Sequence, residues 1–165
     1  MKAVLISIQP KWVEKIASGK KTIEVRKTRP KIDTPFKCYI YCTKDGYEVT
    51  TMGSDKPIIW HGKVIGEFVC DRIDDLRYVP TKYYLQPAGT WEEIICKSSC
   101  LSVDQIKEYA KGKAVYGWHI SDLKIYDKPK ELSEFKCAEY HYSNIHLPQR
   151  NITRPPQSWQ YIEIN

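Results

Sequence analysis

The stretch Gly19–Arg26 reads GKKTIEVR, and it joins the end of an expected helix to the start of an expected strand. Apolar and polar residues alternate along its second half, which is the period of a β-strand. A strand over residues 20–26 would therefore place Glu24 and Arg26 on the face opposite its two aliphatic side chains, Ile23 and Val25.

Lys21 precedes the alternating part of this strand, where the helix end releases the chain, so an amine, a carboxylate and a guanidinium can converge on one polar face. Gly19 allows the chain to turn tightly at the end of the helix. Such a group of charges can bind an anion or transfer a proton. It can equally be an exposed strand face whose ion pair contributes well under ~1 kcal/mol. The residues alone leave both interpretations open.

Outward from this stretch, short strands alternate with short helices. Residues 1–9 predict a strand, and Pro10 suits the first turn of a helix over residues 11–18, which Gly19 would end. The other expected elements are strands over residues 36–43, 63–77, 114–121, 123–126 and 159–164, and helices over residues 91–96 and 103–111, each opened by a capping box.

This order predicts an α+β fold, a small mixed β-barrel flanked by short helices. The strands mostly follow one another in the chain, and strand–helix–strand crossovers are few, unlike those of a doubly wound sheet. A closed or nearly closed barrel would leave no exposed sheet edge. The 165 residues fit a single domain over residues 1–165, with a variable excursion at about 133–156.

The composition argues against a disordered or membrane-spanning chain. Hydrophobic residues make up 42% and charged residues 28%, as is usual for a globular domain. No apolar run approaches the ~20 residues of a membrane helix. The first residues, MKAVLISIQPKW, form too short an apolar region for an export signal. We therefore expect a cytoplasmic protein that does not contact a membrane.

The six cysteines are expected to be reduced thiols rather than disulfides, because no export signal is recognised. Cys38 and Cys42 lie four residues apart in an expected strand, which favours core thiols. We expect neither a metal nor a cofactor. The alternative is a zinc site, for which the donors would be Cys96, Cys100, Cys137 and His141.

The net charge of +6 is concentrated near one end of the chain. Residues 1–40 contain ten Lys and Arg but only three Asp and Glu, whereas the rest of the chain is nearly balanced. A local basic patch favours an anionic partner, most often a nucleic acid. A solvated basic face without a partner is the alternative.

The spacing G-x-K-x-x-E-x-R within Gly19–Arg26, after a short helix that contains Trp12, resembles the signature of the ASCH domain family. Two further segments are similar to this family, especially to its phage- and prophage-associated branch. They are YGWHISDLKIYDKP at residues 116–129 and RPPQSWQY at residues 154–161. The three similarities occur in order and cover the chain apart from its variable loops.

The resemblance implies a PUA-like fold, with a cleft lined by the signature. It also implies RNA binding, and some members resemble amidohydrolases of N4-acetylcytidine or are described as ribonucleases. In the amidohydrolase branch the signature lysine, here Lys21, is catalytic. A threonine follows it three residues later, where this chain has Glu24. A distant glutamate completes that set, and its candidates here are Glu92 and Glu93.

The chemistry of these residues favours binding. An ammonium paired with Glu24 has no lone pair for nucleophilic attack, but it suits contact with a phosphate or a base edge. For RNA cleavage, Lys21 and Arg26 would stabilise the pentacoordinate phosphate, and Glu24 or His119 would accept the 2′-hydroxyl proton. His119 can also be a core histidine.

The sequence therefore predicts an RNA- or nucleotide-binding module, or alternatively a hydrolase of a modified nucleoside or a ribonuclease. RNA or a modified nucleoside is the expected partner. The two aromatic candidates, Tyr41 and Trp118, would stack on a base. The main catalytic candidates are Lys21 and Glu24. Weaker candidates are Glu92, Glu93 and His119. The candidates for ligand binding are Lys20, Arg26, Arg29, Tyr41 and Trp118.

Overall fold

The computed structural model describes residues 2–44, 60–76, 91–138, 141–142, 145–146 and 150–164. Its elements are β1 (Lys2–Ile8), α1 (Pro10–Ala17), β2 (Ile23–Arg26), β3 (Phe36–Cys42), β4 (Val64–Cys70), β5 (Ile73–Asp75), α2 (Trp91–Ser99), α3 (Val103–Ala110), β6 (Tyr116–His119), β7 (Ser121–Lys130), the 3₁₀ turn η2 (Leu132–Glu134), β8 (Lys136–Cys137), β9 (His141–Tyr142), β10 (Ile145–His146) and β11 (Trp159–Glu163).

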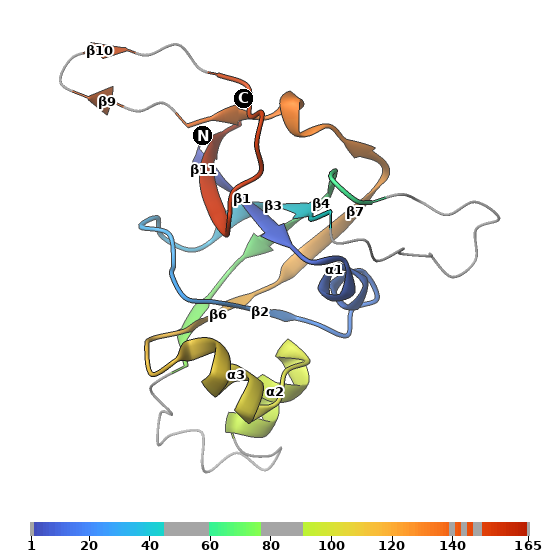
Figure 1. The fold of residues 1–165 in the computed structure, drawn as a ribbon, viewed down its shortest axis with the longest axis vertical. Coiled ribbons are helices and arrows are strands. Elements are labelled where there is room, and N and C mark those ends of the chain that lie inside the picture. Colours follow the sequence, from blue (N-terminus) through green and yellow to red (C-terminus); the bar gives the residue numbers. More distant parts are fainter. Residues whose placement is uncertain are drawn as a thin grey trace.

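The larger sheet has six strands in the order β7-β4-β3-β1-β11-β8 (Figure 1). β1 runs parallel to β3 and antiparallel to β11, so the sheet is mixed. Every residue of β1 after Lys2 is buried, because both faces of the sheet are covered. One face packs on the main core, and the other packs on a second cluster that includes Phe135 and Ile152.

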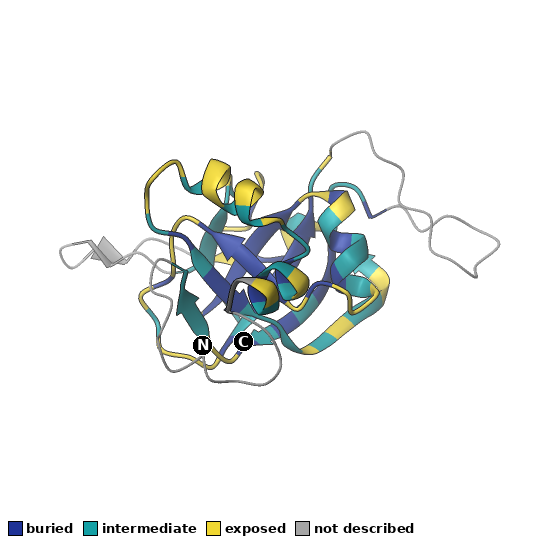
Figure 2. Ribbon diagram, turned by 90° about the horizontal axis from the view of Figure 1, so that it is seen from below, coloured by how far each residue is buried: buried dark blue, intermediate teal, exposed yellow. Residues whose placement is uncertain are grey.

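The smaller sheet has the order β2-β6-β5 and is fully antiparallel. It packs against the larger sheet through Trp118, which is 0% exposed and contacts the rings of Phe36 and Trp159. Its other face is covered by α2 and α3 (Figure 1), through a small cluster that centres on Ile23 and Ile95. Buried strands thus lie between more exposed helices (Figure 2).

The structure confirms a mixed α+β fold but not a closed barrel. Among the described strands, the two main sheets meet through side chains and share no backbone pairing. The expected strand over residues 63–77 is two strands, β4 and β5, that belong to different sheets. No helix in the described part of the chain is long and apolar enough to span a membrane.

Local signals identified the end of α1 and the start of α3. α2 extends to Ser99, beyond the expected end at residue 96, and the capping box expected before it lies outside the described residues. Ser102 and Gln105 form the expected capping box at α3, with the Gln105 amide donating to Ser102 Oγ at 3.2 Å. Gly19 follows α1 with φ of +72°, a conformation that glycine adopts without strain. The excursion at 133–156 contains β8 and the short pair β9–β10, with the rest of it partly outside the described residues.

We expect Trp118→Ala to lower the free energy of unfolding by about 3–5 kcal/mol, because it opens a cavity between the two sheets. Chemical denaturation at neutral pH measures the effect. The matched control is Lys128→Ala on β7, an exposed position where the change should stay within about 0.5 kcal/mol. A loss below about 1 kcal/mol for Trp118→Ala would show that the two sheets do not depend on this side chain.

Candidate functional site

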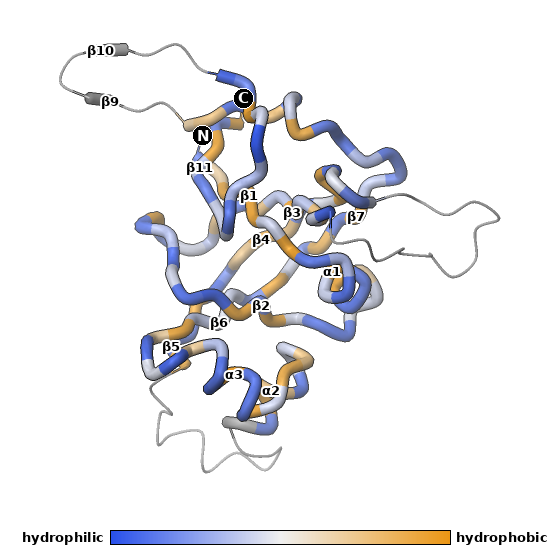
Figure 3. The backbone as a smooth tube through the Cα atoms, in the orientation of Figure 1, coloured by the Kyte–Doolittle hydropathy of each residue, from blue (hydrophilic) through white to orange (hydrophobic). Residues whose placement is uncertain are grey.

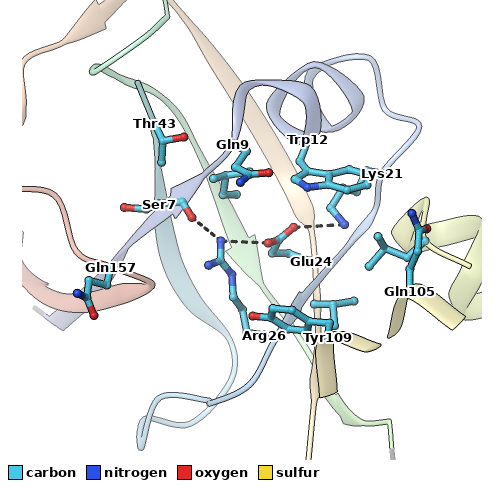
Figure 4. Close-up of a pocket in the computed structure, with 13 residues that line it drawn as sticks. Ser7, Gln9, Trp12, Lys21, Glu24, Arg26, Thr43, Gln105, Tyr109 and Gln157 are labelled. Atoms are coloured by element: carbon cyan, nitrogen blue, oxygen red, sulfur yellow. Dashed lines mark hydrogen bonds and ion pairs between the residues drawn. The ribbon is translucent and has the colours of Figure 1, made fainter. Parts of the chain in front are cut away.

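A pocket of about 470 Å³ lies where β1, α1, β2 and α3 meet (Figure 4). Three charged residues of the sequence signature form part of its wall. Its lining consists of Ser7, Ile8, Gln9, Trp12, Lys21, Glu24, Val25, Arg26, Thr43, Leu101, Gln105, Tyr109 and Gln157.

Lys21 is held at the C-terminus of α2. Its backbone amide donates to the carbonyl of Lys15 in the last turn of α1. Its ammonium donates to the carbonyl oxygen of Ser99, the last residue of α2, at 2.7 Å. A cation is favourable there, because the carbonyl end of a helix carries partial negative charge. The residue is only 2% exposed.

Glu24 lies between the two cations and connects them. Its Oε2 is 3.3 Å from Lys21 Nζ, and its Oε1 is 3.0 Å from Arg26 Nη2. Arg26 Nη2 also donates to the carbonyl of Ser7 in β1, and Nη1 lies 3.4 Å from Ser158 Oγ. A continuous chain of polar contacts therefore runs from α2 through β2 to β1. Figure 4 shows the part of it from Lys21 to Ser7.

This group, which we call the charge chain (Lys21, Glu24 and Arg26), is buried. Glu24 is 6% and Arg26 8% exposed, so the alternative of an exposed strand face is wrong. The larger sheet and α1 cover the face that the strand pattern left open. Two cations against one carboxylate leave a surplus positive charge, and Arg26 Nε has no hydrogen-bond partner among the described residues. A buried surplus charge favours an anionic or hydrogen-bond-accepting ligand.

Trp12 brings further cations to the same wall. Lys11, Lys15 and Lys21 place their ammonium nitrogens 4.9–5.2 Å from the centroid of its ring. Such contacts stabilise the cations beside the electron-rich face of the indole. Helical spacing puts Trp12 on the apolar face of α1 with Val13 and Ile16, which predicts a core residue. Its ring packs on the core but also lines the pocket.

Several uncharged polar residues of the lining were not predicted from the sequence. Gln105 and Tyr109 lie on α3, on the opposite side of the pocket from Gln157 (Figure 4). Helical spacing predicts that Tyr109 shares the apolar side of α3 with Ile106, but Tyr109 is 38% exposed, the most exposed large hydrophobic side chain described. Only the position of α3 against β2, which depends on tertiary packing, brings these side chains to the pocket.

The two aromatic candidates lie elsewhere. Tyr41 is buried in the cluster on the far face of the larger sheet, together with Tyr39 and Phe135, and burial raises its pKa. Trp118 is fully enclosed between the sheets. Neither lines the pocket, so the geometry gives no support for stacking of a base on either ring.

The remaining basic and acidic candidates lie outside the pocket. Lys20 is exposed, and its carbonyl contacts the thiol of Cys100. Arg29 is exposed in the loop after β2. Glu93 is exposed in the first turn of α2 and does not line the pocket. The side chain of Glu92 lies outside the described residues.

His119 belongs to a different cluster. Its Nε2 is 2.6 Å from Asp74 Oδ2 and 3.0 Å from Arg72 Nη2. Burial tends to raise the pKa of Asp74, but the histidine and the guanidinium outweigh it and lower that pKa. His119 does not line the pocket, so it is not placed to act with Glu24.

None of the six cysteines forms a disulfide in the structure. Cys38 and Cys42 are buried in the main core, which confirms them as core residues, and burial raises the pKa of the Cys38 thiol far above its usual value. For the zinc alternative, no group of three potential ligands occurs in the described part of the chain. Cys96 and Cys100 lie at α2, whereas Cys137 lies on β8; the side chain of His141 is outside the described residues.

Comparisons with known proteins agree with this fold. A family model described as the ASCH domain matches residues 6–142. The crystal structure of an ASCH protein from Zymomonas mobilis is similar, with a TM-score of 0.60 and 21% identity over 98% of this chain and 87% of that one. A point mutant of that protein gives a TM-score of 0.60 at 21% identity, over 99% of this chain and 91% of that one. A second point mutant gives a TM-score of 0.59 at 20% identity, over 98% of this chain and 88% of that one. No curated protein matches the chain.

We expect Glu24→Gln to lower the free energy of unfolding by about 3–5 kcal/mol, because it leaves two cations buried without a carboxylate. Urea denaturation at neutral pH measures the loss. Glu108→Gln on α3 is the matched control, since this exposed carboxylate forms no ion pair with a described residue and should change stability by less than about 0.5 kcal/mol. Equal stability of the two variants would contradict a structural role for the charge chain.

Proposed function

Because the chain belongs to the ASCH domain family, we propose that it binds single-stranded RNA and holds one nucleotide in the pocket at the charge chain. The observation that carries this proposal is the buried surplus of positive charge in the wall of an open pocket. Phosphodiester groups carry one negative charge each, which complements that surplus.

The donors needed for such a ligand are present. An ammonium has three N–H groups, and the contacts of Lys21 with Ser99 and Glu24 leave a third for a ligand. Gln9, Gln105 and Gln157 carry amides that can both donate and accept, which suits the edges of an unpaired base.

The size and the aromatic rim of the pocket also support a single nucleotide. Sites for small ligands usually enclose about 300–1,000 Å³, and this pocket falls in that range. Trp12 and Tyr109 offer rings on which an unstacked base can lie. A base paired within a duplex would not be free to enter, so we infer a preference for single strands.

We expect a labelled single-stranded hexanucleotide to bind the wild-type protein with an affinity that falls steeply as salt rises, because phosphate contacts release counterions. Lys21→Met should weaken binding about 10- to 100-fold, the usual loss for a charge-assisted hydrogen bond. Fluorescence anisotropy at low and physiological salt measures both effects.

Two companion variants keep this experiment interpretable. Tyr109→Ala, at the exposed rim, removes a stacking surface without touching the charge chain and should also weaken binding, whereas Lys128→Ala should change it less than about twofold. Melting curves identify variants that are unfolded. Salt-independent binding, or equal affinity in all folded variants, would reject the pocket as the RNA site.

A second candidate is hydrolysis of a modified nucleoside such as N4-acetylcytidine. It is favoured by the amine and carboxylate that face each other in the pocket wall at 3.3 Å. Glu24 would activate a water molecule for attack on the acyl carbon, and the Lys21 ammonium would donate a proton to the departing amine. For cleavage of RNA, Glu24 would be the base, because His119 lies outside the pocket.

If the protein is such a hydrolase, an equimolar mixture with N4-acetylcytidine should release cytidine and acetate. Mass spectrometry would detect both products. Lys21→Met should abolish the release, and Lys128→Ala should not. Unchanged substrate with wild-type protein after long incubation would reject hydrolysis, and release that persists in folded Lys21→Met would assign it to a contaminant.

A further inference from the structure

The loop after β2 forms a second concave surface of about 590 Å³. It contains three exposed cations, Lys27, Arg29 and Lys31, and a single carboxylate, that of Asp33. The hydrophilic colour of this loop in Figure 3 contrasts with that of the strands beside it. We call this surface the basic groove; it is lined by Lys27, Thr28, Arg29, Pro30, Lys31, Ile32, Asp33 and Tyr116.

The basic groove and the pocket share a wall. Arg26 lines the pocket, and the next residue, Lys27, lines the groove. The ammonium of Lys27 lies 4.7 Å from the centroid of the Tyr109 ring, and Tyr109 lines the pocket. A ligand that leaves the pocket across Tyr109 therefore meets Lys27 first.

The groove is held in place by β11. Trp159 Nε1 donates to Thr28 Oγ1 at 2.9 Å, and the amide of Lys31 donates to the hydroxyl of Tyr161 at 2.6 Å. Pro30 is buried between these two anchors. The loop thus fixes its backbone while its cations remain exposed, which lowers the entropic cost of binding.

The cations of the groove are available to a ligand. None of the three forms an ion pair with a carboxylate in the part of the chain that the structure describes. Arg29 lies over the ring of Tyr116, with 5.7 Å between the guanidinium carbon and the ring centroid. Alternating aromatic rings and cations are typical of surfaces that follow the backbone of single-stranded nucleic acid.

We propose that the basic groove is a second subsite that binds the phosphodiester backbone of the strand whose nucleotide occupies the pocket. This inference rests on the proposed RNA binding and adds to it a direction, from the pocket across Tyr109 and Lys27 toward Arg29 and Lys31. It makes the preferred ligand an oligonucleotide rather than a free nucleoside.

The test compares a single-stranded dinucleotide with a hexanucleotide on three forms of the full chain. They are the wild type, a groove variant (Lys27→Ala, Arg29→Ala and Lys31→Ala) and a control variant that loses the same charge from exposed positions on β7 and β8 (Lys124→Ala, Lys128→Ala and Lys136→Ala). Affinities are measured by anisotropy between about 0.05 and 0.25 M salt.

In the wild type the hexanucleotide should bind more tightly than the dinucleotide. The groove variant should lose about 10- to 50-fold in hexanucleotide affinity at physiological salt and about 2 in the slope of log affinity against log salt, since each phosphate contact contributes about 0.7. The affinity of the groove variant for the dinucleotide should fall by a smaller factor. The control variant should keep the slope within about 0.5 of the wild type.

The results separate this inference from the proposed function. If the groove and control variants bind the hexanucleotide alike, or if the wild type shows no dependence on length, the second subsite is rejected, and loss of binding in Lys21→Met still supports the pocket. If Lys21→Met and Tyr109→Ala bind as the wild type does, the pocket is rejected. A variant that keeps the charges but exchanges the side chains (Lys27→Arg, Arg29→Lys and Lys31→Arg) should keep the hexanucleotide affinity of the wild type. That result would support charge, rather than shape, as the feature recognised.

Discussion

The buried charge chain is the constraint on which the rest of the structure depends. Lys21 ties the C-terminus of α2 to the start of β2, and Arg26 ties the end of β2 to β1. Glu24 supplies the only carboxylate of the three. Such an arrangement is costly to bury, and removal of one member costs more than replacement of the whole set by apolar residues would. The positions of two sheets and a helix thus follow from one eight-residue stretch, Gly19–Arg26.

The same contacts explain why the pocket exists where it does. Side chains that hold elements together normally fill the space between them. Here the charge chain spans the space between the elements along one wall of the pocket. On the other side, α3 contributes Gln105 and Tyr109 to the lining (Figure 4). The pocket is therefore walled on one side by rigid, mutually paired groups and on the other by more exposed side chains. This division suits recognition of a charged group in a fixed position beside a planar group.

Much of the fold and the charged wall of the pocket could be predicted from local signals, but the burial of that wall and the rest of the lining could not. The alternation in β2, the capping box at Ser102 and the glycine after α1 depend on neighbouring residues and were predicted correctly. Alternation does not say which face of a strand a second layer will cover. The face of Glu24 was therefore open to two interpretations, and Tyr41, expected to contact the ligand, lies on a face that packs on a separate core. Tyr109 was misplaced because α3 is held mainly through Ile106.

The position of Lys21 at the end of α2 has a consequence for how such sequences are classified. A descendant of this protein that had lost its ligand would still bury the three side chains of the charge chain, and loss of any one of them alone would leave a buried charge without its partner. Selection for folding alone would preserve the signature in that descendant. The signature is therefore a marker of architecture, and residues outside the charge chain that line the two proposed subsites, such as Gln157 and Arg29, are better indicators of whether a relative shares the proposed binding.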